Sequence, residues 1–273
     1  MTFHITDFPV GVGAFGPRSI GNLLSWHDSS DSSSCLTSTS PETPATNGQT
    51  VTRWKDKSGN GYHLDQGTGI SQPTVVTGAL NGRQVLNFDG SNDSMVTGFS
   101  YALASSKTMT VFVVGKSDLT TQAAWLAFHR TGQPDYSSCF SNLVVTSSTW
   151  LQMGIGDGGL AGSSYNVWTT SQTVNSYFIQ ATRMSTSAIS HRRNGATSTL
   201  ADGNGTMAIG SWMSLGAGSY RMVAGAREGD TNNTPDHFHD GQLAELIIYN
   251  AVLSDSDTAK VESYLSSKWG VAL

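Results

Sequence analysis

Short runs of alternating or continuous apolar residues, separated by turn-forming residues, dominate the chain from residue 84 onward. Such runs are typical of β-strands, whose side chains point alternately to opposite faces. The run 111–114 is apolar throughout, which predicts a central strand covered on both faces. Many short strands with turns between them indicate a sandwich or barrel. We predict strands at 84–88, 109–115, 125–129, 143–146, 150–155, 176–184, 189–193, 220–226 and 243–249.

Asn-Gly dipeptides at 60–61, 81–82 and 194–195 predict tight hairpin turns, because both residues tolerate the positive φ angles of a type I′ turn. One stretch has helical spacing instead. Ser254 is a candidate N-cap with an aspartate three residues on, and apolar residues then recur every three or four positions up to Trp269. The following glycine is placed to end the helix. We therefore predict a short C-terminal helix that packs on the sandwich.

The chain divides into an arm and one domain. Residues 1–20 hold two prolines and three glycines between positions 9 and 17, a spacing that predicts an extended N-terminal arm. Residues 21–273 form the predicted domain. Within it, residues 29–50 are rich in Ser, Thr, Pro and Asn, which predicts a long surface loop inserted into the fold.

Composition narrows the function classes. Only 13% of the residues are charged, against about 25% in an ordinary soluble domain, so the surface must be polar without being ionic. The net charge is −5, and the only basic cluster is Arg192-Arg193, so we predict no nucleic-acid partner. The chain has no long apolar run and no signal-like start, so we predict no membrane insertion and no secretion signal. Cys35 and Cys139 are read as free thiols.

Four segments occur in an order that resembles a known family: 24–28 (LSWHD), 54–61 (WKDKSGNG), 87–93 (NFDGSND) and 241–254 (GQLAELIIYNAVLS), followed by Tyr264-Leu265 and Lys268-Trp269-Gly270. They resemble the concanavalin A-like, laminin-G-like jelly-roll domains of bacteriophage virion proteins and bacterial surface proteins. The resemblance covers about residues 21–273. It implies an all-β, two-sheet antiparallel jelly-roll sandwich, often used to hold glycans and sometimes carrying Ca²⁺. It does not imply a reaction, because fold alone does not choose a function.

Two aspartates and two histidines lie within five residues near the last predicted strand: Asp236, His237, His239 and Asp240. If the segment is extended, the histidines share one face and the aspartates the other. Imidazoles suit zinc-like ions and carboxylates suit Ca²⁺, so these four are the candidate metal ligands. No third ligand follows from the spacing, and a polar loop is the competing interpretation. No cofactor is required by the sequence, and Ca²⁺ is the one that the resemblance allows.

Aromatic side chains are the usual platform for sugar rings. The candidate glycan-binding residues are Trp168 and Tyr165 in a Gly/Ser-rich stretch, Trp212, and Tyr136. A glycosidase would need two carboxylates across the scissile bond, and the four glutamates of the chain form no Glu-x-Asp-x-x-Glu pattern. Glu228 and Asp230 are two residues apart, but the sequence after them predicts a loop. We predict no catalytic residue and no enzyme.

These patterns together predict a non-catalytic structural or adhesion protein on the surface of a bacteriophage particle, as a head-decoration, fibre or tail-associated component that also binds glycan. The expected partners are other virion proteins, host-surface glycan and further copies of the chain in a homo-oligomer. The alternatives are a free carbohydrate-binding lectin, on a bacterial surface or extracellular, and a glycoside hydrolase. The arm would dock on its partner through five apolar residues: Phe3, Ile5, Phe8, Val10 and Phe15.

Overall fold

The computed structural model describes residues 15–97, 101–102, 108–118, 123–130, 139–145, 150–156, 164–170, 174–185, 188–202, 219–228 and 234–273. For 101–102, 130, 139–145, 150–156, 164–170, 200–202, 219–220 and 228 the description covers the backbone alone. Within these residues the protein is built of antiparallel strands and one α-helix. The predicted all-β class is therefore confirmed.

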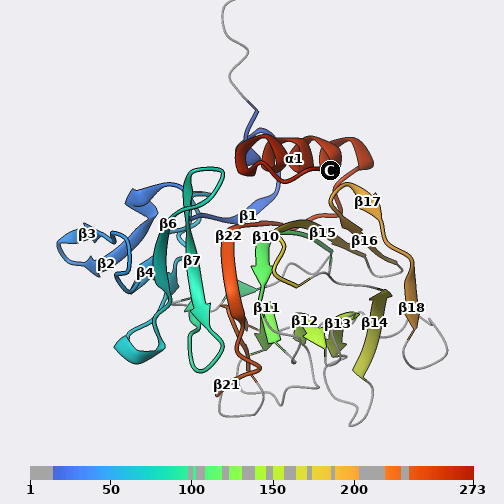
Figure 1. The fold of residues 1–273 in the computed structure, drawn as a ribbon. Helices are drawn as coiled ribbons and strands as arrows, with labels where there is room; N and C mark the ends of the chain where they lie inside the picture. Colours follow the sequence, from blue (N-terminus) through green and yellow to red (C-terminus); the bar gives the residue numbers. More distant parts are fainter. Residues whose placement is uncertain are drawn as a thin grey trace, which may run out of the picture.

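Two large antiparallel sheets form the sandwich in the described part of the chain (Figure 1). Sheet A has eight strands. Both β1 and β7 pair with β22, along different parts of that strand. In order, sheet A holds β17 (Ala196–Thr197), β16 (Ile189–Arg193), β15 (Phe178–Met184), β10 (Met109–Ser117), β22 (Asp240–Tyr249), β7 (Arg83–Asp89) and β6 (Thr74–Leu80), with β1 (Leu23–Asp28) off this path.

Sheet B has twelve strands among the described residues. In order, it holds β18 (Leu200–Asp202), β14 (Ser164–Thr170), β13 (Trp150–Gly156), β12 (Cys139–Val145), β11 (Ala123–Arg130), β19 (Ser219–Ala224), β8 (Met95–Thr97), β5 (Leu64–Asp65), β4 (Arg53–Trp54), β2 (Cys35–Thr39) and β3 (Glu42–Pro44), with β9 (Tyr101–Ala102) on β19. A separate pair joins β20 (Arg227–Glu228) to β21 (Pro235–Asp236). Short 3₁₀ turns span Pro17–Ser19, Ser32–Ser34 and Gly69–Ser71.

The helix α1 (Asp255–Trp269) adds a third layer on the outer face of sheet A. Figure 1 shows it lying across β1, β22, β10 and β15, with β11 to β14 on the opposite side of these strands. Val261, Leu265 and Trp269 are fully buried against sheet A, and each such burial stabilises the fold by about 1.5–3 kcal/mol. The predicted C-terminal helix is confirmed.

Both helix ends follow the predicted capping pattern. The Ser254 hydroxyl accepts a hydrogen bond from the Asp257 N–H at 3.1 Å. Gly270 ends the helix in the left-handed region at φ +70°, where its N–H donates to the Ser266 carbonyl. The terminal residues alone therefore specify where this helix begins and ends.

The strand β10 separates the two cores, as the apolar run 111–114 predicts. Val111 and Val113 join the core between the sheets, whereas Phe112 and Val114 face α1. The Asn81-Gly82 and Asn194-Gly195 dipeptides form two-residue hairpin turns with both φ angles positive. The connection holding Asn60-Gly61 is longer and joins β4 to β5.

The structure differs from the sequence expectation at two segments. Residues 29–50, expected as a surface loop, contain β2 and β3, which extend sheet B through β4. The end of the expected arm belongs to the domain: Pro17 is buried and its carbonyl accepts the Tyr249 hydroxyl at 2.9 Å. Among the described residues, no helix combines the length and apolar character needed to span a membrane.

Candidate functional site

The outer face of sheet A divides into two halves. Over one half, α1 packs on apolar side chains, whereas over the other half the outward positions of neighbouring strands are polar. Lys116 of β10 pairs in register with Gln242 of β22, which pairs with Asn87 of β7. We call this half the polar sheet face. Its residues are at least partly exposed, and they are Tyr177, Lys116, Gln242, Asn87, Asp118, Asp240 and Asp89.

A chain of contacts orders the first row of this face. The Tyr177 hydroxyl donates to Oε1 of Gln242, whose Nε2 lies 3.4 Å from Oδ1 of Asn87. Nζ of Lys116 lies 2.9 Å from Oδ1 of Asp118 and 5.8 Å from the centre of the Tyr177 ring. Burial and the charge of Asp118 raise the pKa of Tyr177 to about 12, so this phenol remains a donor at neutral pH. The row therefore offers an aromatic ring, amides and one ammonium.

The second row brings like charges together. Asp240 pairs in register with Asp89, and Asp118 donates its backbone N–H to the Asp240 carbonyl. Burial raises the pKa of Asp240, and the charges of Asp118 and Asp89 raise it further. Directly opposed like charges destabilise a sheet. A row of carboxylates that costs stability is a feature typical of a binding site.

Asp93 lies just behind this row, in the turn after β7. Its Oδ2 accepts the backbone N–H of Asp89 at 3.0 Å, and the residue is 5% exposed. Burial raises its pKa to about 6, and the charge of Asp89 contributes to this rise. The Asp93 carboxyl therefore stabilises the turn through the backbone of Asp89, whose side chain remains exposed.

The structure places the four candidate metal ligands in three separate environments. Asp236 and His237 lie beside Arg227, with both Asp236 oxygens 3.0 Å from the guanidinium and one oxygen 2.8 Å from His237. Although burial opposes it, the hydrogen bonds from His237 and Arg227 hold the pKa of Asp236 at about 2. Asp240 lies on the polar sheet face. Within the described residues, no three His, Cys, Asp or Glu side chains are arranged to hold a metal ion.

His239 is part of the interior. It is fully buried beside Phe88 and Trp125, with ring centres 6.0 and 6.4 Å away, and burial lowers its pKa to about 3. A Cβ on the neighbouring Gly241 would lie 2.9 Å from this ring and 2.2 Å from the Lys116 carbonyl. His239 is therefore a neutral packing residue here.

The candidate glycan-binding aromatics fall outside the described side chains. Tyr165 and Trp168 lie on β14, where their backbones pair with Ile155 and Gln152, and nothing is described beyond the backbone. Trp212 and Tyr136 lie outside the described residues altogether. All four remain predictions.

Of the candidate docking residues, Phe15 is described. Its ring packs edge-on against Tyr264 of α1, with the centres 6.3 Å apart, and it joins the outer core. Phe3, Ile5, Phe8 and Val10 lie outside the described residues.

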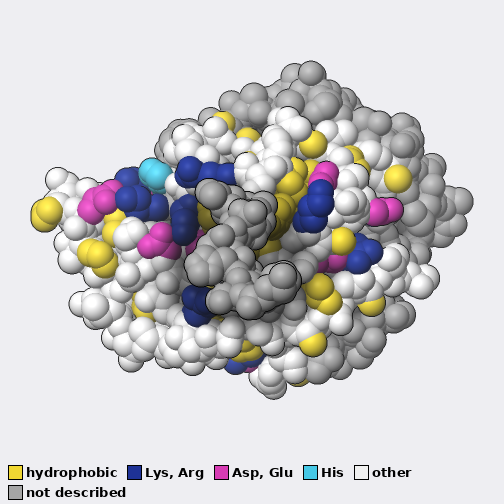
Figure 2. Space-filling view, turned by 90° about the horizontal axis from the view of Figure 1, so that it is seen from above, with side chains coloured by type: hydrophobic (Ala, Val, Ile, Leu, Met, Phe, Trp, Pro, Cys, Tyr) yellow, Lys and Arg dark blue, Asp and Glu magenta, His cyan; other side chains and the backbone are white. Residues whose placement is uncertain are grey.

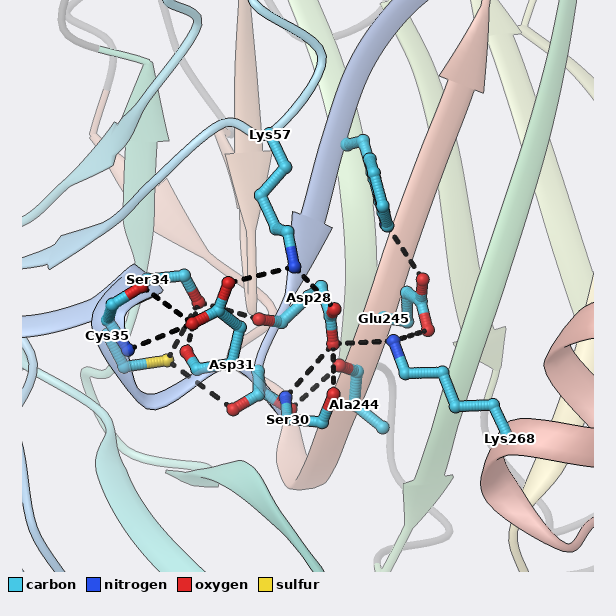
Figure 3. Close-up of polar contacts among 12 residues, drawn as sticks. Asp28, Ser30, Asp31, Ser34, Cys35, Lys57, Ala244, Glu245 and Lys268 are labelled. Carbon is cyan, nitrogen blue, oxygen red and sulfur yellow. Dashed lines mark hydrogen bonds and ion pairs between the residues drawn. The ribbon is translucent and has the colours of Figure 1, made fainter. Parts of the chain in front are cut away.

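Three of the four segments that carry the family resemblance, 24–28, 54–61 and 241–254, meet the end of α1 at a buried ionic cluster (Figure 3). Glu245 of β22 accepts four donors: Trp26 Nε1 at 2.7 Å, Tyr264 Oη at 3.0 Å, Lys268 Nζ at 2.7 Å and Trp269 Nε1 at 2.6 Å. Figure 3 shows Lys268 reaching from α1 to Glu245 and to Asp28. Because Glu245 is fully buried and saturated, this cluster fixes α1 to sheet A and has no free group for a ligand.

Ion pairs also tie α1 to the edge of sheet A. Arg192 lies 2.9 Å from Glu262, and Arg183 lies 2.5 Å from Asp255. Seen from the α1 side, Lys and Arg side chains lie in small groups with Asp and Glu side chains nearby (Figure 2). The helix layer is therefore a rigid support for the strands that carry the polar sheet face.

The fold is similar to several solved structures. A Trypanosoma rangeli sialidase, solved with the inhibitor DANA, matches at a TM-score of 0.52 and 14% identity, over 92% of this chain and 34% of that one. A Ruminococcus gnavus IT-sialidase carbohydrate-binding module, CBM40, bound to α2,3-sialyllactose, matches at 0.45 and 14% over 64% and 93%. A heptameric SAP-like pentraxin from Limulus polyphemus matches at 0.48 and 13% over 66% and 80%. No family model and no curated protein matches the chain. At these identities the likeness concerns the fold.

Proposed function

We propose that this protein binds carbohydrate without cleaving it, and that the polar sheet face is the surface it uses. The single observation behind the proposal is the row of Tyr177, Lys116, Gln242 and Asn87, held side by side by three neighbouring strands and by the residue that precedes β15. An aromatic ring beside amides and charged groups is the combination that sugar recognition uses. Sites built on strands also hold their geometry better than sites on loops.

Each group has a role in such binding. The Tyr177 ring would pack on the C–H face of a sugar, and the amides of Gln242 and Asn87 can donate to and accept from its hydroxyls. Asp89 and Asp240 would accept hydrogen bonds from sugar hydroxyls, which gives their crowded carboxylates partners that carry no negative charge. The surface needs no group to change its covalent state.

The finer setting, a bacteriophage virion protein that assembles as a homo-oligomer and docks through its N-terminal arm, is also proposed, and its support is the sequence resemblance and the apolar pattern of the arm. Removing residues 1–14 should abolish attachment to particles and leave glycan binding unchanged. A variant that still attaches would contradict the docking role of the arm.

A glycan array followed by calorimetry on the retained sugars tests the binding proposal. Tyr177→Ala should weaken binding at least tenfold, and Tyr177→Phe should weaken it less because the ring remains. Gln49→Ala is the matched control, since Gln49 is exposed and, among the described residues, its side chain accepts hydrogen bonds from the neighbouring Thr46 alone. If the wild type retains no glycan, or if Tyr177→Ala binds like wild type, the proposal is wrong.

A glycoside hydrolase is the second candidate, because one turn beside the polar sheet face holds two carboxyls, with Asp93 accepting the backbone N–H of Asp89 at 3.0 Å. Such an enzyme would release product from the sugars that it binds, and Asp93→Asn would stop the release. Binding without product release would leave the non-catalytic proposal standing.

A further inference from the structure

A second polar group lies on the inner face of sheet A, at β15 and β16. Gln180 pairs in register with Arg193, and Thr182 pairs with His191. Alternation along the strands places these four side chains on the side that faces sheet B, with Phe178 and Met184 of the inner core. Figure 1 shows β15 and β16 opposite β12, β13 and β14. We call Gln180, His191 and Arg193 the inner polar group.

Four buried atoms of the inner polar group lack hydrogen-bond partners. Gln180 is fully buried, and neither its Oε1 nor its Nε2 has a hydrogen bond. His191 is fully buried as well, with Nδ1 3.1 Å from the Thr182 hydroxyl and Nε2 unpaired. Nη1 of Arg193 is buried and unpaired. Each buried polar group left without a partner destabilises the fold.

Arg193 differs from the other arginines of β15 and β16 in the face of the sheet that it occupies and in its lack of an ion pair. Arg192 and Arg183 point to the opposite face, where Glu262 and Asp255 respectively neutralise them. Among the described residues Arg193 has no carboxylate partner, and its guanidinium stacks on the Phe178 ring at 4.3 Å. Burial lowers its pKa to about 10, which still leaves it cationic at neutral pH. A buried cation without a counter-charge is costly enough to require a reason.

The three side chains present donors. The guanidinium offers a planar fork of N–H groups, and the Gln180 amide offers another donor beside it. Burial lowers the pKa of His191 to about 3, so the ring is neutral at pH 7. When the Thr182 hydroxyl donates to Nδ1, the proton of His191 sits on the unpaired Nε2, which then donates as well. Arg193 is partly exposed, so solvent reaches the group at this residue.

We propose that the inner polar group is a binding site for the carboxylate of a small ligand, which supplies the counter-charge that Arg193 lacks. The carboxylate would take two N–H bonds from the Arg193 fork and further bonds from Gln180 and His191. The carboxylate could belong to an acidic sugar or to a free organic acid. The site is separate from the polar sheet face, and it stands whether or not that face binds glycan.

Thermal-shift and calorimetric titrations with sodium glucuronate, sodium acetate and glucose test the site. Glucuronate should raise the melting temperature of the wild type. Glucose lacks a carboxylate, so it should not bind at the inner polar group. A response to acetate as well assigns the site to free acids, and a response to glucuronate alone assigns it to acidic sugars. Arg193→Met should lose at least tenfold in carboxylate affinity, because a charge-assisted pair is removed.

The unliganded variant separates a binding role from a structural one. Arg193→Met removes an unpaired buried cation, so its melting temperature should equal or exceed that of the wild type. Arg192→Met is the control, since it removes a cation from the opposite face and should keep carboxylate binding. If Arg193→Met does not fold, Gln180→Leu takes its place in the measurements of carboxylate affinity and melting temperature. A wild type that responds to neither carboxylate, or an Arg193→Met that responds like wild type, overturns the proposal.

Discussion

Replacing Glu245 by Gln should release α1 from sheet A. All four groups around this carboxylate are donors, so an amide would turn its own N–H₂ toward two of them, whichever way it is oriented. Two buried donors left unpaired cost about 2–6 kcal/mol, and breaking a buried ion pair costs about 3–5 kcal/mol. Lys268 keeps Asp28 at 2.6 Å, so the loss is partial. We expect Glu245→Gln to lower the free energy of unfolding by about 3–5 kcal/mol.

Urea denaturation followed by tryptophan fluorescence measures this change, because the Trp26 and Trp269 indoles both donate to Glu245. Glu42→Gln is the matched control: its ion pair with Lys55 is solvent-exposed, and its loss should hardly move the midpoint. If Glu245→Gln unfolds at the same urea concentration as the control variant, the cluster does not hold the helix, and the argument from saturated donors fails.

Substitutions at Asp93 and at Gly225 give two further predictions. The pKa of Asp93 is raised to about 6, so its contribution to stability is largest at acid pH and is lost as the pH rises through 6. Asp93→Asn should therefore be about 1–2 kcal/mol more stable than wild type at pH 8 and no more stable near pH 4, as urea titrations at both pH values would show. Gly225→Ala would put a Cβ 2.2 Å from the buried Phe88 ring at a φ of +80°. Its expected cost is about 2–4 kcal/mol by calorimetric melting, and a cost near zero would show that this turn can shift.

The elements of this fold could be predicted because each depends on neighbours in sequence. The strand at 111–114 can be predicted from its apolar run alone, and the helix from Asp255 can be predicted from its capping residues and its apolar spacing. The β2 and β3 strands were missed because Ser, Thr and Pro favour turns, and here the pairing of Cys35 with Trp54 outweighs that preference.

The polar sheet face could not be predicted in the same way, because it depends on the register of strands far apart in the chain. Asn87, Lys116 and Gln242 each stand as an ordinary polar residue near a strand end. Only the pairings of β22 with β10 and β7 set them in one row. The signal available from sequence was a polar residue at an outward position of each strand, and it does not reveal which strands are neighbours.

Some residues that carry the resemblance to jelly-roll domains hold the fold together, whereas others, namely Asn87, Asp89 and Gln242, lie on the polar sheet face. Asp56, one of the motif residues, accepts the backbone N–H groups of Trp26, Ser58 and Tyr62, and so connects two parts of the chain. Glu245 likewise connects α1 to sheet A, through side-chain donors. Groups saturated in this way stabilise a fold and have no capacity left for a ligand. The proposed recognition therefore depends on side chains with unused capacity, among them the crowded carboxylates of the polar sheet face and Arg193, whose Nη1 is unpaired.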